Sequence, residues 1–247
     1  MKIQINYLLA IFFISLNVSA ERITLKTKDG FQLAANFIDA GSNAKFGVLM
    51  LHQCNSDKSM YSELAKLLAE QGINSLALDF RGFADSTTPT FSRKLLREQS
   101  KSRKELMDKI KEVNKFWQGD VELAYEYLVN KIGSNKISII GASCGGYITI
   151  KFAQKIKPQS LVLFSSGLDE KGMASFNQVS DIPALIIAAQ GDEYTFNSSN
   201  RIFRSARNQQ TKLLLYKGNG HGHPLFKHDT NLKNIMVNWF LSHELSE

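Results

Sequence analysis

The sequence has little of the residues that define several protein classes. Among its 247 residues there are only 4 prolines and 2 cysteines, and charged residues make up 21%. Two cysteines are too few for a zinc cluster alone or for the disulfide framework of a small secreted domain. With 43% hydrophobic residues, the chain is not mainly disordered, and its length predicts one globular domain with a small insertion.

The N-terminus has the layout of a secretory signal peptide. Lys2 precedes an apolar run of about 12 residues from Tyr7 to Val18, and a membrane span needs roughly 20. Ser19 and Ala20 then complete a stretch that resembles a cleavage site. We therefore predict a signal peptide at residues 1–20, a mature domain at 21–247 and export, to the periplasm or out of the cell. A membrane anchor or a buried strand is the alternative for the apolar run.

Apolar runs along the chain predict a mostly parallel sheet. Residues 22–27 and 31–38 alternate around Asp29-Gly30, which predicts an antiparallel hairpin. The later runs are nearly continuous, as is typical of strands covered on both faces. They occupy residues 46–51, 73–80, 137–140, 160–164, 184–189 and 212–216. Helical periods separate several of them, so the pattern predicts a doubly wound α/β fold.

Residues 87–117 do not fit a minimal α/β unit, and a stripe from Leu106 to Trp117 predicts an inserted helix there. Residues 93–115 hold nine basic and four acidic residues, so they supply +5 of the +6 net charge that remains after cleavage. A solvated helix face is the simplest interpretation. A weak contact with an anionic membrane surface or with an anionic substrate is the alternative. Aromatic residues are not interleaved with these charges, so we expect no nucleic-acid partner.

One glycine-rich motif predicts a catalytic nucleophile. Residues 141–145 read Gly-Ala-Ser-Cys-Gly, which is G-x-S-x-G directly after a predicted strand and before a predicted helix. In that context the serine, Ser143, sits on a sharp strained turn that projects its hydroxyl above the sheet. A phosphate-binding turn is the alternative, but the segment lacks the lysine of a P-loop.

A serine hydroxyl needs a general base, and the base needs an orienting carboxylate. Asp192 follows the predicted strand 184–189, and His221 follows the strand 212–216, so both belong to one edge of the sheet. His223 is an alternative base, and we favour His221 because the flanking glycines leave its loop free to reach the serine. Asp169 and Glu193 are alternative carboxylates.

Acyl transfer also needs two backbone N–H donors for the oxyanion. We expect one from Cys144, the residue after the nucleophile, and the other from the loop after residues 46–51. In that loop Cys54 is the first choice and Gln53 the second. This placement brings the two cysteines near one another, so they form either a disulfide or a pair of buried free thiols.

Five motifs in order resemble the α/β-hydrolase superfamily. They are Leu51-His52-Gln53, residues 79–86 (DFRGFADS), the Ser143 turn, Gly191-Asp192 and Gly220-His221-Gly222. In the first two motifs Gln53 and Ala84 stand where members of the superfamily have glycine. Gly145-Gly146 and the small size are similar to dienelactone-hydrolase-like members, which carry cysteine where this chain has Ser143. Only residues 165–183 lie between two late strands, which is too short for a large cap domain.

The resemblance implies an α/β-hydrolase fold and a carboxylesterase-like serine hydrolase. The substrate would be a small-molecule ester, cleaved through an acyl-enzyme on Ser143 with His221 and Asp192, and no cofactor or metal would be needed. A peptidase or amidase of the same fold is the alternative enzyme. A non-catalytic binding protein on a hydrolase scaffold is the alternative outside enzymology.

Overall fold

The computed structural model describes residues 19–244, so residues 1–18 of the predicted signal peptide lie outside the described part. Within the described residues, none of the helices has the length and apolar character to cross a membrane. The first strand begins at Glu21, the residue at which we predict the mature chain to start.

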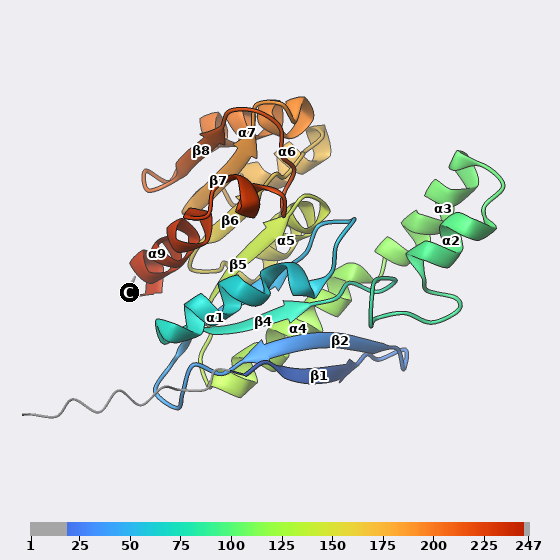
Figure 1. Cartoon of the computed structure of the whole chain (residues 1–247), viewed down its shortest axis with the longest axis horizontal. Helices are drawn as coiled ribbons and strands as arrows, with labels where there is room; N and C mark the ends of the chain where they lie inside the picture. The colour runs from blue at the N-terminus through green and yellow to red at the C-terminus, as the bar shows by residue number, and fades with distance from the viewer. Residues whose placement is uncertain (1–18, 245–247) are drawn as a thin grey trace, which may run out of the picture.

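One eight-stranded sheet runs through the molecule in the order β1-β2-β4-β3-β5-β6-β7-β8 (Figure 1). Its strands are β1 (Glu21–Lys26), β2 (Gln32–Ile38), β3 (Phe46–Leu51), β4 (Asn74–Leu78), β5 (Lys136–Ala142), β6 (Leu161–Phe164), β7 (Ala184–Ala189) and β8 (Lys212–Tyr216). β1 and β2 form the predicted antiparallel hairpin, and β2 also pairs antiparallel with β4. Strands β3 to β8 are parallel to one another. The predicted mostly parallel sheet is confirmed.

Helices cover both faces of the sheet, which explains the continuous apolar runs. One face carries α1 (Ser62–Glu70), α8 (Leu225–His228) and α9 (Leu232–Glu244), and the other carries α4 (Trp117–Ile132), α5 (Cys144–Ile156), α6 (Glu170–Asn177) and α7 (Glu193–Ser205). Strand β3 shows the division, because Val48 and Met50 pack toward α1 and α9 whereas Leu49 and Leu51 pack toward α4 and α5. Strand β3 thus supplies two separate cores.

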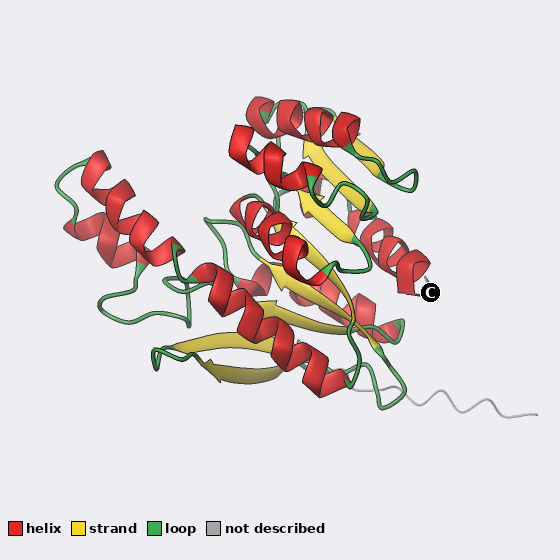
Figure 2. Ribbon diagram, turned by 180° about the vertical axis from the view of Figure 1, so that it is seen from behind, coloured by secondary structure: helices red, strands yellow, loops and turns green. Residues whose placement is uncertain are grey.

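The insertion is a helical hairpin rather than the single helix that we predicted. It consists of α2 (Arg93–Gln99) and α3 (Arg103–Asn114), which project from the body beyond the carboxyl end of β4 (Figures 1 and 2). Ser92 Oγ accepts the Leu95 N–H and Ser102 Oγ accepts the Glu105 N–H, so each serine caps its own helix. Because Ser102 caps the start of a new helix, a turn at residues 100–102 separates α2 from α3.

The loop between β4 and α2 is held by a buried arginine. The Arg81 side chain is 1% exposed and pairs with Asp120 at 2.8 Å and with Asp29 of the β1–β2 turn at 2.5 Å. The Trp117 indole N–H donates to the Arg81 carbonyl at 3.1 Å. Ala84, where the resembled motif has glycine, adopts a φ of 38°. These contacts fix the base of the hairpin beside the carboxyl ends of the parallel strands.

Candidate active site

Ser143 lies at the turn between β5 and α5. Its backbone has φ 52° and ψ −116°, a strained conformation for a residue with a side chain. Two hydrogen bonds hold the turn, from Ser143 N–H to the Phe164 carbonyl at 2.8 Å and from Gly146 N–H to the Ser143 carbonyl at 3.0 Å. Ser143 therefore occupies the sharp strand-to-helix turn that the motif predicts.

The glycines of the motif are required by close packing. A Cβ on Gly145 would lie 2.4 Å from the Leu51 carbonyl oxygen, and one on Gly141 would lie 2.5 Å from the Gly145 carbonyl oxygen. Only glycine permits such an approach of helix α5 to the end of strand β3. The tight packing brings the start of α5 against the loop that follows β3.

The structure brings His221 and Asp192 together. His221 Nδ1 lies 2.6 Å from Asp192 Oδ2, and both side chains are only partly exposed. Since a carboxylate only accepts, Nδ1 carries the proton when the imidazole is neutral, and Nε2 is left as a base. Thr195, which is 3% exposed, donates its hydroxyl to the same Asp192 oxygen. The carboxylate is thereby held in one orientation.

The alternative residues lie in other surroundings. Asp169 is the N-cap of α6, where its side chain accepts the Gly172 N–H at 2.8 Å. Glu193 begins α7 and is exposed. The His223 ring packs against Phe226 with 6.0 Å between ring centroids. Among the described hydrogen bonds, the one that joins a histidine to a carboxylate of this edge is that of His221.

A buried histidine orients the loop after β3. The Phe80 N–H donates to His52 Nε2 at 3.0 Å, so His52 Nδ1 carries the proton and donates to the Gln53 carbonyl at 2.8 Å. Burial lowers the pKa of His52, which agrees with this neutral tautomer. Across a trans peptide the C=O and the next N–H point in opposite directions. The Cys54 N–H is therefore directed away from His52.

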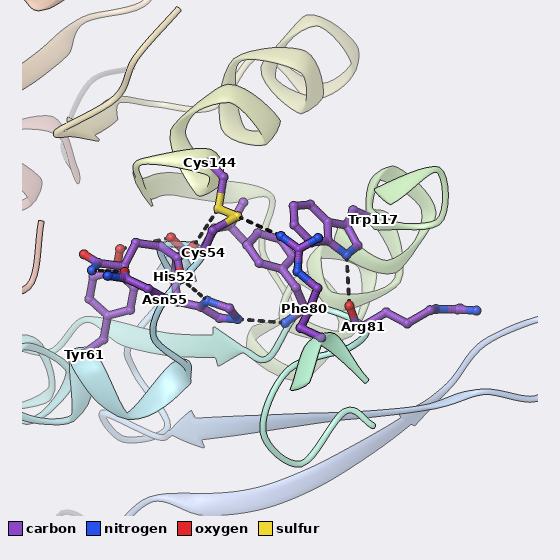
Figure 3. The surroundings of a disulfide bond; sticks show 11 residues. His52, Cys54, Asn55, Tyr61, Phe80, Arg81, Trp117 and Cys144 are labelled. Atoms are coloured by element: carbon purple, nitrogen blue, oxygen red, sulfur yellow. Dashed lines mark hydrogen bonds between the residues drawn. A yellow bond between two sulfur atoms is a disulfide. The ribbon is translucent and has the colours of Figure 1, made fainter. Parts of the chain in front are cut away.

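A disulfide joins the two residues that we predict as oxyanion donors. Cys54 and Cys144 are bonded, with their Cα atoms 5.8 Å apart (Figure 3). The structure thus favours the first of the two states that the sequence left open. One guanidinium nitrogen of Arg93 lies 3.8 Å from Cys54 Sγ, and burial lowers the pKa of Arg93. The bond ties the loop after β3 to the first turn of α5.

A cleft of about 840 Å³ opens beside Cys144. Helix α3 contributes Met107 to it, α5 contributes Tyr147 and Ile148, and α7 contributes Tyr194. Polar groups at the cleft are Asn114, Lys115, Gln118, Lys151 and Asp169. Its size and its largely apolar lining suit a small organic molecule.

Comparison with known protein families shows to which family the chain belongs. The model of the family described as serine aminopeptidase, S33, a hydrolase family, matches residues 42–179, more than half of the chain. The chain belongs to this family. The family match and the sheet order together make it a hydrolase of the α/β-hydrolase fold, as the motifs predict.

Individual relatives agree with this family assignment. The uncharacterized protein YfhR of Salmonella typhimurium is 25% identical over 226 residues, which cover 81% of this chain and 74% of YfhR. A Pyrococcus furiosus esterase has a similar structure, with a TM-score of 0.69, 15% identity and coverage of 92% of this chain and 93% of that one. A dienelactone hydrolase from Anabaena variabilis gives a TM-score of 0.67 at 16% identity, covering 92% and 98%. At 15% and 16% identity, these two similarities show that the chain shares its fold with both proteins.

Several residues of the site escape prediction from the sequence. Thr195 follows Asp192 by three residues, a spacing within one helical turn that offers a weak local signal. Ser165, and Gln53 in a role other than the oxyanion donor that the sequence suggests, contact the His221 loop from the loops after β6 and β3, 57 and 170 residues away in the chain. A pattern within one segment carries no information on such contacts.

Proposed function

We propose that this protein hydrolyses carboxylic esters by covalent catalysis from Ser143, with His221 as the general base and Asp192 as its orienting carboxylate. The 2.6 Å hydrogen bond between His221 and Asp192, at the edge of the sheet where the strained Ser143 turn also lies, carries the proposal. The esterase among its structural neighbours is consistent with it.

In the proposed acylation step, Ser143 Oγ attacks the ester carbonyl carbon while its proton moves to His221 Nε2. The carbonyl oxygen becomes an oxyanion, which the N–H groups of Cys54 and Cys144 would bind. The tetrahedral intermediate then expels the alcohol, which takes the proton from His221. Water, activated by the same histidine, attacks the acyl-enzyme, releases the acid and restores Ser143.

The cleft beside Cys144 would take one part of the ester. Its apolar lining by Met107, Tyr147 and Tyr194 favours a hydrophobic acyl or alcohol group. Within residues 19–244, the connection between β6 and β7 is short and forms no large cap over this edge, which suits an exposed ester carbonyl.

We also propose that the protein is exported. The N-terminal signal pattern motivates this proposal, and a disulfide between Cys54 and Cys144 is a bond that persists in oxidising compartments. The mass of the purified exported chain tests it. A product that begins near Glu21 is expected, and an intact Met1 on exported protein would contradict cleavage.

The α2–α3 hairpin is proposed to make a weak contact with anionic membrane surfaces. Lys109, Lys111 and Lys115 of α3 form ion pairs with neighbouring acids. Five exposed basic residues of the hairpin make none within residues 19–244: Lys94, Arg97, Lys101, Arg103 and Lys104. Unpaired cations of this kind attract anionic headgroups.

The test of the catalytic proposal compares the wild type with Ser143→Ala. The wild type should hydrolyse p-nitrophenyl esters and react with a fluorophosphonate probe, and the variant should lose about 10³-fold or more of the ester turnover and all labelling. Matched anilide substrates decide between an esterase and the peptidase alternative. Full ester turnover by Ser143→Ala would refute the nucleophile. A wild type that neither turns over nor labels would favour a binding protein.

A further inference from the structure

Gln53 links the loop after β3, to which it belongs, with the loop of residues 217–224, which carries His221 and is called the histidine loop below. It stands where the resembled motif has glycine, and its side chain is 3% exposed. Its Oε1 accepts the His223 N–H at 2.8 Å, across 170 residues of sequence. Its Nε2 donates to Asn55 Oδ1 within its own loop. Both the oxygen and the nitrogen of this buried amide therefore have hydrogen-bond partners.

Ser165 holds the same histidine loop from another side. Its Oγ accepts the Gly222 N–H at 2.9 Å, and its own N–H donates to the Ile187 carbonyl at 2.7 Å. Ser165 is fully buried and has a φ of 47°, a conformation that is rare for a residue with a Cβ. Backbone strain of this kind persists only where the surroundings enforce it.

The histidine loop packs closely against the side chain of Gln53. Gly222 has a φ of 63°, and a Cβ at this position would lie 1.9 Å from Gln53 Oε1. The two backbone N–H groups that follow His221 in sequence thus have fixed partners, Ser165 for Gly222 and Gln53 for His223. Besides the side-chain bond to Asp192, these contacts determine where the His221 ring lies.

We propose that Gln53 and Ser165 are positioning residues for His221, and that Gln53 couples the histidine loop to the loop that carries the Cys54 N–H. This inference rests on the proposed function. A general base must lie within hydrogen-bond reach of the hydroxyl that it deprotonates, and small displacements reduce the rate strongly. One side chain thereby fixes the spacing between the base and an oxyanion donor.

The central experiment replaces Gln53 with methionine, which has a similar volume and no hydrogen-bonding amide. In Gln53→Met, kcat for p-nitrophenyl butyrate should fall about ten- to a hundredfold, while KM stays within about twofold. Gln53→Glu keeps an acceptor oxygen for the His223 N–H and should recover part of the loss. Gln154→Met is the matched control, because Gln154 is a partly buried glutamine of α5 whose amide donates to the Ser175 carbonyl at 3.0 Å, a contact that involves neither of these two loops.

A second measurement separates positioning from a general loss of stability. The downfield proton resonance of the His221–Asp192 hydrogen bond should broaden or move in Gln53→Met and stay in Gln154→Met. The low-pH limb of the kcat/KM–pH profile, where the base becomes protonated, should shift only in Gln53→Met. Ser165→Ala, which leaves the Gly222 N–H without its partner, should also lower kcat. The double variant should lose less than the product of the two single losses, because both act on one loop.

Failure of this positioning proposal and failure of the proposed function would give different experimental results. Fluorophosphonate labelling of the wild type tests whether Ser143 is a nucleophile at all. If the wild type is labelled and Gln53→Met keeps kcat within about twofold with an unchanged resonance, Gln53 is not a positioning residue. If Gln53→Met does not fold, Ser165→Ala decides by the same two readouts, and an unchanged kcat there overturns the proposal.

Discussion

Cys54 and Cys144 are covalently joined, although 90 residues separate them in the chain. One belongs to the loop after β3 and the other to the first turn of α5, so the bond fixes the distance between the two backbone N–H groups proposed to bind the oxyanion. The bond therefore joins the stability of the fold to the geometry of the proposed oxyanion site.

Replacing both cysteines with alanine should affect stability and activity together. The disulfide closes a loop of about 90 residues, and its loss should lower the free energy of unfolding by about 2–4 kcal/mol. The freed loop should also lower kcat by about tenfold or more, since an oxyanion donor contributes about 10²–10³ in rate. Denaturation and ester hydrolysis measure the two effects. Wild type treated with a dithiol should match the variant, and equal kcat in all three would show that the bond does not position the donors.

Substitution of each histidine of the loop should distinguish their roles. His221→Gln removes the proposed base and should lower kcat by about 10³-fold or more. His223→Gln keeps the backbone N–H that Gln53 binds, so kcat should remain within about fivefold of the wild type. Ester turnover by the two variants, checked for folding by circular dichroism, is the measurement. The reverse order of losses would make His223 the base.

Asp85 should contribute to stability in a pH-dependent way. The hydrogen bond from Lys58, at 2.6 Å, lowers the pKa of Asp85 below its usual value of 3.8. A depressed folded-state pKa stabilises the protein above the unfolded value, and this contribution is lost as pH falls through the folded value. Asp85→Asn should thus be less stable than the wild type at pH 7, and the difference should shrink below about pH 4.

Thermal unfolding between about pH 2 and pH 7 measures this dependence. Asp39→Asn is the control, because Asp39 is exposed and makes no ion pair within residues 19–244. A difference between the wild type and Asp85→Asn that stays constant with pH would show that the Lys58 contact does not act through the charge of Asp85.

The hairpin should bind vesicles that contain anionic lipid and not vesicles of neutral lipid alone. Reversing three of its unpaired charges, in Arg97→Glu/Lys101→Glu/Lys104→Glu, should weaken co-sedimentation by about tenfold or more. The matched control reverses Lys136, Lys212 and Lys227, which are exposed lysines outside the hairpin. Equal binding by both triple variants, or none by the wild type, would remove the membrane proposal.

Most of the fold follows from the sequence because it depends on local pattern. Continuous apolar runs predict the parallel strands, and Asp29-Gly30 predicts the β1–β2 hairpin, where Gly30 has a φ of 82°. The break between α2 and α3 was not predicted, because the apolar stripe from Leu106 to Trp117 begins only after it, and the separate helices are marked by the Ser92 and Ser102 caps. The stripe also ends too late, since α3 ends at Asn114 and Trp117 begins α4. Capping depends on one side chain, which periodicity does not register.

The residues of the site also differ in whether the sequence pattern can predict them. Ser143, Asp192 and His221 can be proposed from the sequence because each follows a strand of a parallel sheet, and the ends of such strands share one edge. The roles of Gln53 and Ser165 depend on how three loops pack against one another, with hydrogen bonds across 170 and 57 residues. Only the three-dimensional structure contains that information.

The disulfide also changes what a cut in the hairpin would do. The turn at residues 100–102 lies between Cys54 and Cys144, so it is inside the ring of chain that the bond closes. A protease that nicked this turn would produce two fragments that migrate together without reductant and separate after reduction. The projecting hairpin is thus a place where the backbone can be severed while the two halves of the protein stay covalently attached.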